Sequence, residues 1–67
     1  MSSDNLVKMA NQIAHYFDSE PDHGLAVKGV RQHLQSFWTP AMRRQLGDWI
    51  EANAGEGVDP KVVEALT

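Results

Sequence analysis

The stretch Phe37-Trp38-Thr39-Pro40-Ala41-Met42 decides the fold, because it joins the end of one helix to the start of the next. Thr is a good N-cap and Pro is favoured at the first helical position, so a helix is predicted to begin at Pro40. Asp59-Pro60 repeats this pattern and predicts a second helix start there. Both boundaries follow from local backbone chemistry alone.

Apolar residues recur at intervals of three and four on both sides of this boundary, which is typical of amphipathic helices. The helix before it runs from about Leu25 to Trp38, with Gly29 in its interior, where a closely approaching backbone would make a glycine tolerable. The helix after it ends near residues 53–55, where Asn53 or Gly55 can supply a left-handed C-cap.

A further helix is predicted at the N-terminal end, beginning at Ser3 or Asp4 and stopped by the turn at residues 18–22. The helix that starts at Pro60 is only about two turns long, so it must dock on the others to be stable. We therefore expect an all-α fold: a small bundle of three helices plus a short C-terminal fourth helix, forming a single domain over residues 1–67.

Composition excludes several classes of protein. The 67 residues include no cysteine, so disulfides, iron–sulfur clusters, thiolate zinc sites and a cysteine nucleophile are ruled out. Six basic against nine acidic residues give a net charge of −3, which disfavours nucleic acid. Neither a long apolar span nor a signal peptide is recognisable, so we expect a cytoplasmic chain with no membrane contact.

The sequence predicts no catalytic, cofactor-binding or metal-binding residue. His15 with Asp18, and His23 with Asp22, have weak spacing for a metal site, and there is no HExxH motif. The serines lie in no GxSxG elbow, and the carboxylates at residues 18–22 lie in an exposed turn rather than an apolar pocket.

A partner-binding surface is predicted instead, because the apolar sector of the first helix is close to 180° wide. Adjacent Phe37 and Trp38 point about 100° apart, so only one of them can enter the core. Cations near a helix N-terminus, as at Arg43-Arg44, are mildly unfavourable unless they bind something else. The predicted interface comprises Met9, Ile13, Tyr16, Phe37, Trp38, Arg43 and Arg44.

Two alternatives apply to this surface. The short fourth helix could cover Met9, Ile13 and Tyr16. The two arginines could be solvated or could pair with Asp48 one turn later.

The chain resembles the delta subunit of multisubunit, NAD-dependent formate dehydrogenases. The similarity rests on residues 6–14 (LVKMANQIA) and 37–43 (FWTPAMR), and continues in Gly55, residues 58–60 (VDP) and Ala65-Leu66. These stretches cover nearly the whole chain in the family's order. The resemblance implies a small accessory subunit rather than an enzyme.

In such complexes, the resemblance implies, a large alpha subunit carries a molybdenum or tungsten bis-pterin and iron–sulfur clusters and oxidises formate. Electrons pass to FMN in the beta subunit, where NAD is reduced, and a gamma subunit adds another cluster. The delta subunit carries no cofactor and supports assembly, stability or cofactor insertion of the alpha subunit.

Two other hypotheses belong to different functional classes. The chain could be a self-associating helical adaptor or regulator, which would form a homodimer when isolated. A helix-turn-helix DNA-binding module is disfavoured by the net acidity of the chain.

Overall fold

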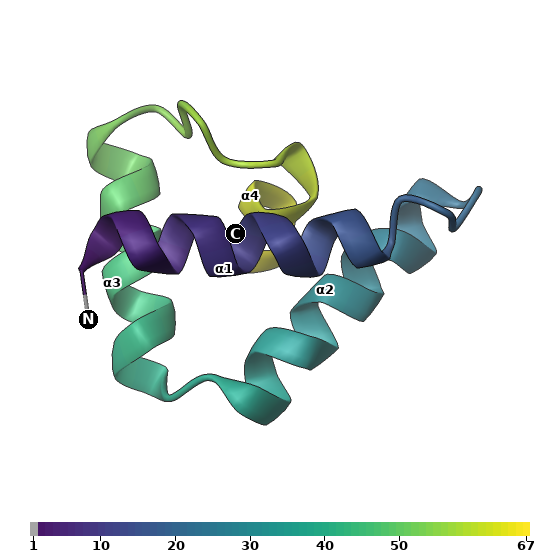
Figure 1. Ribbon diagram of the computed structural model, residues 1–67, viewed down its shortest axis with the longest axis horizontal. Coiled ribbons are helices and arrows are strands. Elements are labelled where there is room, and N and C mark those ends of the chain that lie inside the picture. Colours follow the sequence, from purple (N-terminus) through teal and green to yellow (C-terminus); the bar gives the residue numbers. More distant parts are fainter. Residues whose placement is uncertain (1) are drawn as a thin grey trace.

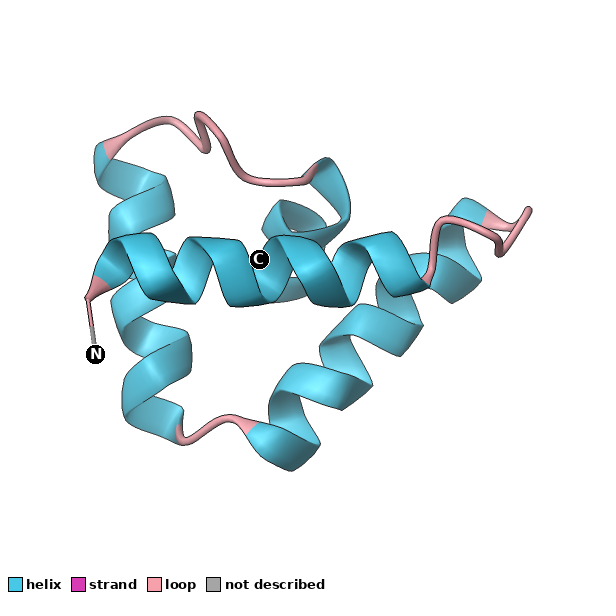
Figure 2. Ribbon diagram, in the orientation of Figure 1, coloured by secondary structure: helices cyan, strands magenta, loops and turns pink. Residues whose placement is uncertain are grey.

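A computed structural model describes residues 2–67 and contains four helices and no strand over that range. The helices are α1 (Ser3–Tyr16), α2 (His23–Phe37), α3 (Pro40–Ala52) and α4 (Pro60–Leu66). Figure 2 shows that everything between them is turn or loop. The predicted all-α fold of three helices and a short fourth one is therefore confirmed.

The two helix starts that were predicted from Thr-Pro and Asp-Pro are confirmed. The side chain of Thr39 accepts a hydrogen bond from the backbone N–H of Met42 at 3.1 Å, and Pro40 is the first residue of α3. The side chain of Asp59 accepts one from the N–H of Lys61 at 2.9 Å at the start of α4. Each cap satisfies a backbone donor that the helix itself leaves free.

The other two helices start slightly earlier than predicted. Ser2, rather than Ser3 or Asp4, caps α1 by accepting from the N–H of Asn5 at 3.2 Å. Asp22 caps α2 by accepting from the N–H of Leu25 at 3.0 Å. In both cases the capping side chain accepts a hydrogen bond from the backbone N–H three residues ahead. The helix therefore begins before the first apolar residue of the periodic pattern.

The end of α3 is a Schellman-type turn. The N–H of Gly55 donates to the carbonyl of Ile50 at 2.9 Å, which is the bond that closes such a turn. Gly55 is left-handed with φ of 72°, as predicted, but Asn53 is not, with φ of −116°. The residue directly after the C-cap, Ala54, is also left-handed, with φ of 53°.

Two helices, α2 and α3, diverge from their connection at residues 38–39, and α1 and α4 lie across the opening between them (Figure 1). The most extensive helix packing is that of α4 on α2. One apolar cluster joins all four helices and consists of Leu6, Ala10, Ala14, Val27, Val30, Leu34, Trp38, Leu46, Ile50, Val58, Val62 and Ala65.

Polar side chains fix the short helix α4 in place. The side chain of Asn11 donates to the carbonyl of Gly57 and accepts from the N–H of Asp59, both at 2.9 Å. The guanidinium of Arg31 donates to the carbonyls of Glu64 and Ala65 at the other end of the helix, both at 3.3 Å. These contacts supply the docking that a helix of this length requires.

No helix among residues 2–67 combines the length and the apolar composition needed to cross a bilayer.

Candidate functional site

An apolar hollow lies between α1, α2 and the first turn of α3, and its cavity volume is about 510 Å³. We call it the aromatic groove. Five of the seven residues that were predicted to bind a partner line it, with three others. The lining consists of Met9, Gln12, Ile13, Tyr16, His33, Phe37, Trp38 and Met42.

The aromatic side chains of the groove divide into buried and exposed ones. Trp38 is only 6% exposed and belongs to the core cluster, whereas Phe37 is 73% exposed. The helix ends between them, because Trp38 is the C-cap of α2 with extended backbone angles. This confirms that the two rings point in different directions. Across the groove, Tyr16 is 78% exposed.

The alternative that α4 covers the apolar face of α1 is wrong. The loop that leads into α4 is fixed to α1 through Asn11, which is about 160° around α1 from Met9. Its own buried residues are Val62 and Ala65, and Tyr16 remains exposed. The polar bridge from Asn11 therefore places α4 on the side of α1 away from the groove.

Four lining residues were not selected from the sequence. The groove continues into a smaller hollow of about 270 Å³, which adds Phe17 to the lining. The rings of His33 and Phe37 are 4.7 Å apart and those of Tyr16 and Phe17 are 5.0 Å apart, edge to face. A spacing of four residues already places His33 beside Phe37 on one face of a helix, and that signal could have identified it. The four residues are Gln12, Phe17, His33 and Met42.

The two arginines have different roles. The guanidinium of Arg43 donates to the carbonyls of Trp38 at 2.7 Å and Leu34 at 3.1 Å. It therefore supplies hydrogen bonds to backbone carbonyls at the C-terminal end of α2. This role explains why a cation lies near the start of α3. The side chain of Arg44 is exposed, and within the described part of the chain neither arginine forms an ion pair with Asp48.

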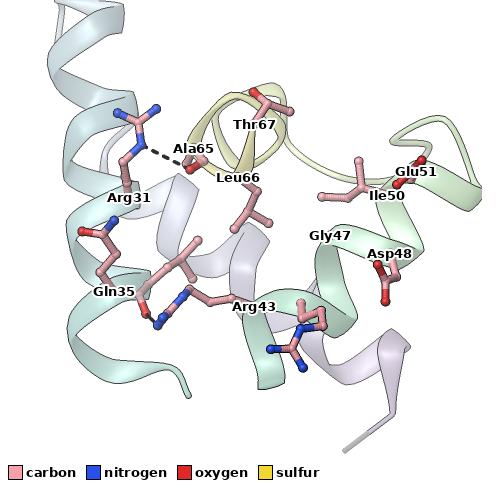
Figure 3. Close-up of a pocket in the computed structure, with 12 residues that line it drawn as sticks. Arg31, Gln35, Arg43, Gly47, Asp48, Ile50, Glu51, Ala65, Leu66 and Thr67 are labelled. Carbon is pink, nitrogen blue, oxygen red and sulfur yellow. Dashed lines mark hydrogen bonds between the residues drawn. The ribbon is translucent and has the colours of Figure 1, made fainter. Parts of the chain in front are cut away.

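A second and more polar cleft lies between α2, α3 and the end of α4 (Figure 3). Its volume is about 760 Å³. Arg31, Arg43 and Arg44 line it together with the carboxylates of Asp48 and Glu51. The guanidinium groups of Arg31 and Arg43 are turned toward backbone carbonyls and do not converge on one point.

The acidic turn at residues 18–22 serves as an anchor for α4. Lys61 donates to Asp18 at 2.7 Å, and this hydrogen bond lowers the pKa of Asp18 and raises the pKa of Lys61. His23 bonds Glu64 of the same helix. Residues 2–67 contain no group of three or more His, Asp or Glu side chains that could hold a metal ion.

Comparison with known proteins identifies the family. No curated protein and no solved structure gave a significant match to the chain. A family model described as the NADH-dependent formate dehydrogenase delta subunit FdsD matches residues 5–66, which is nearly the whole chain of 67 residues. This chain therefore belongs to the FdsD family of formate dehydrogenase delta subunits.

Proposed function

We propose that this chain is a non-catalytic accessory subunit that docks on the large alpha subunit of a cytoplasmic, NAD-dependent formate dehydrogenase through the aromatic groove. Docking supports the assembly, stability or cofactor insertion of that subunit. Membership of the delta-subunit family supports the assignment of this chain to a formate dehydrogenase complex. The observation that carries the docking surface is that Tyr16 and Phe37, on opposite walls of the groove, are 78% and 73% exposed.

Large aromatic side chains beside a hollow are the usual anchors of protein interfaces. Covering Tyr16 and Phe37 removes apolar area from water at roughly 25 cal/mol per Å². The half-buried Met9 and Ile13 extend the same apolar surface between them. The groove thus concentrates the apolar surface that the four helices leave uncovered.

The redox chemistry of the proposed complex takes place in other subunits. Formate is oxidised at a molybdenum or tungsten bis-pterin in the alpha subunit, and iron–sulfur clusters lead electrons to FMN in the beta subunit, where NAD is reduced. A gamma subunit adds a further cluster. This chain has no cysteine with which to ligate a cluster. Its contribution is a rigid apolar surface held by four packed helices.

The test is a double substitution of Tyr16→Ala and Phe37→Ala in the full chain, co-expressed with the other subunits. Because both side chains are exposed, we expect the melting temperature of the isolated chain to change little, while affinity for the alpha subunit falls at least about tenfold. The matched control is Leu25→Ala, which truncates an apolar side chain that is 56% exposed and lies outside the groove. Stoichiometric co-purification of the double variant would contradict the groove assignment.

Two further measurements distinguish cofactor insertion from bracing, and docking on the alpha subunit from self-association. Deletion of the chain, followed by metal analysis of the alpha subunit, distinguishes a role in cofactor insertion from bracing. Native mass and the concentration dependence of melting test self-association. A tight homodimer that persists in the presence of the alpha subunit would favour an adaptor that pairs with itself.

A further inference from the structure

His33 is the one titratable side chain of α2 that lies in the aromatic groove. The imidazole lines both the groove and the smaller hollow beside it, so it lies where the two meet. It is half-buried, and within residues 2–67 its side chain forms no hydrogen bond or ion pair. We propose that protonation of His33 controls docking through the groove: the complex forms with the neutral imidazole and weakens when the imidazole takes up a proton. This inference rests on the proposed docking function and adds its regulation.

The neighbours of the imidazole are apolar and aromatic. Its ring centroid is 4.7 Å from that of Phe37, one turn later on the same helix, with the ring planes tilted by 39°. Across the smaller hollow, α1 contributes Ile13 and Tyr16, and Phe17 follows as its C-cap. None of these side chains offers a carboxylate that would stabilise an imidazolium. The face of Phe37 attracts a cation only weakly compared with the water that a cation loses on burial.

The cationic groups near the groove are bound to backbone carbonyls on other faces of their helices. On α3, the guanidinium of Arg43 donates to carbonyls at the end of α2. On α2, Arg31 is about 160° around the helix from His33 and donates to carbonyls of α4. No Asp, Glu, Lys or Arg lines either hollow, so the phenol of Tyr16 on α1 is the other titratable group that faces the imidazole.

The acidic turn after α1 supplies no counter-charge to the imidazole. Asp18 and Glu20 line a separate hollow together with Lys61, and Asp18 pairs with that lysine. Asp22 caps α2 with its side chain. Within residues 2–67, therefore, no carboxylate pairs with His33 and favours its protonated form.

Covering the groove makes docking depend on the charge of His33. In the free chain, water reaches the half-buried ring and solvates either form. A partner placed over Tyr16 and Phe37 removes that water, and an unpaired cation is costly in apolar surroundings. The complex therefore excludes the imidazolium, and docking is linked to release of its proton. An imidazole in water takes up a proton near about pH 6.5, so this linkage acts close to neutral pH.

The pH dependence of binding tests this inference. The full chain carries a fluorescent label and is titrated with a formate dehydrogenase complex purified without it, at constant ionic strength. Because one proton is excluded, the dissociation constant of wild type should rise about tenfold between about pH 7.5 and pH 5.5. His33→Gln keeps a polar side chain that takes up no proton, so its dissociation constant should lack this rise. The ratio of the two constants at each pH removes any titration of the partner.

The other two histidines supply matched controls. His15 is exposed on α1 and His23 is exposed at the start of α2, and neither lines the groove. His15→Gln and His23→Gln remove the same kind of titratable group and should keep the full dependence on pH. Calorimetry in buffers of different ionisation enthalpy gives a second readout. Wild type and both controls should release protons on binding near about pH 6, and His33→Gln should release fewer.

Two results would overturn the inference. An equal pH dependence of wild type and His33→Gln would show that the imidazole stays hydrated in the complex. Tighter binding of wild type at the lower pH would show that the partner presents a carboxylate to His33. Both differ from failure of the docking function, in which wild type does not bind at the higher pH, or binds equally well after Tyr16→Ala and Phe37→Ala.

Discussion

The ring of Phe17 lies directly against the backbone of Gly29. A Cβ atom built on Gly29 would lie 2.8 Å from both Cδ1 and Cζ of that ring, closer than side chains tolerate. Phe17 is the C-cap of α1 and Gly29 lies in the middle of α2, so this contact sets how closely the two helices approach. The sequence suggested that a neighbouring backbone would occupy the space beside Gly29, but an aromatic ring occupies it.

Gly29→Ala is therefore expected to destabilise the fold. Alanine gains about 1 kcal/mol of helix propensity, but displacing the ring costs about 1–3 kcal/mol of overpacking, so the free energy of unfolding should fall by up to about 2 kcal/mol in urea titrations. Gly47→Ala is the matched control, because a Cβ there meets nothing within 4 Å. That variant should gain stability by about 0.5–1 kcal/mol. Equal gains at both sites would show that the Phe17 ring moves freely.

Most of the fold could be predicted from the sequence because capping chemistry is local. Thr39-Pro40 and Asp59-Pro60 define helix starts through bonds to residues two or three positions ahead. The direction in which α4 docks could not be predicted, because it depends on Asn11 meeting the loop at residues 57–59, far along the chain. The periodicity of apolar residues carries no information about a hydrogen bond between one side chain and a distant backbone group.

The candidate site was also only partly predictable from the sequence. Helical spacing placed Met9, Ile13 and Tyr16 on one face, and the structure brings them together with Phe37 in one groove. Spacing could not show that Arg43 is engaged by backbone carbonyls of α2, because that contact depends on the angle between two helices. The binding role of the groove stays a prediction.

Ala54→Gly should stabilise the chain. Ala54 follows the C-cap of α3 with φ of 53°, a left-handed conformation that disfavours residues with a Cβ. Glycine removes this strain at some cost in unfolded-state entropy, so the free energy of unfolding should rise by about 0.5–1 kcal/mol in urea titrations. Ala52→Gly, two residues earlier at the last residue of α3, should instead lower it, because the backbone there is helical and glycine has a low helix propensity. A loss of stability at both positions would contradict the assigned backbone conformation.

The Asp18–Lys61 pair should make stability depend on pH at both extremes. Its hydrogen bond lowers the pKa of Asp18, so that contribution is present above about pH 3.9 and is lost as pH falls through the lowered pKa. The same bond raises the pKa of Lys61, so its contribution is present below about pH 10.4 and is lost as pH rises through the raised pKa.

Lys61→Met tests this window, since it keeps the apolar stem and removes the charge. Urea midpoints of wild type and variant should differ most near neutral pH and converge as the pH falls through the lowered pKa of Asp18 or rises through the raised pKa of Lys61. Lys28→Met is the control, because Lys28 is exposed and forms no ion pair within residues 2–67. A difference that stays constant across the range would show that Lys61 acts through packing alone.

Substitution of Arg43 and substitution of Arg44 should have clearly different effects on the free energy of unfolding. Arg43→Met removes two charge-assisted hydrogen bonds and leaves the carbonyl of Trp38 without its side-chain donor, while the carbonyl of Leu34 keeps the N–H of Trp38, so the free energy of unfolding should fall by about 1–2 kcal/mol. Arg44→Met alters an exposed side chain and should stay within about 0.5 kcal/mol of wild type. Chemical denaturation of the isolated variants measures both. If the two losses are equal, the bond from Arg43 to the last turn of α2 contributes nothing, and both arginines become equally available to a partner.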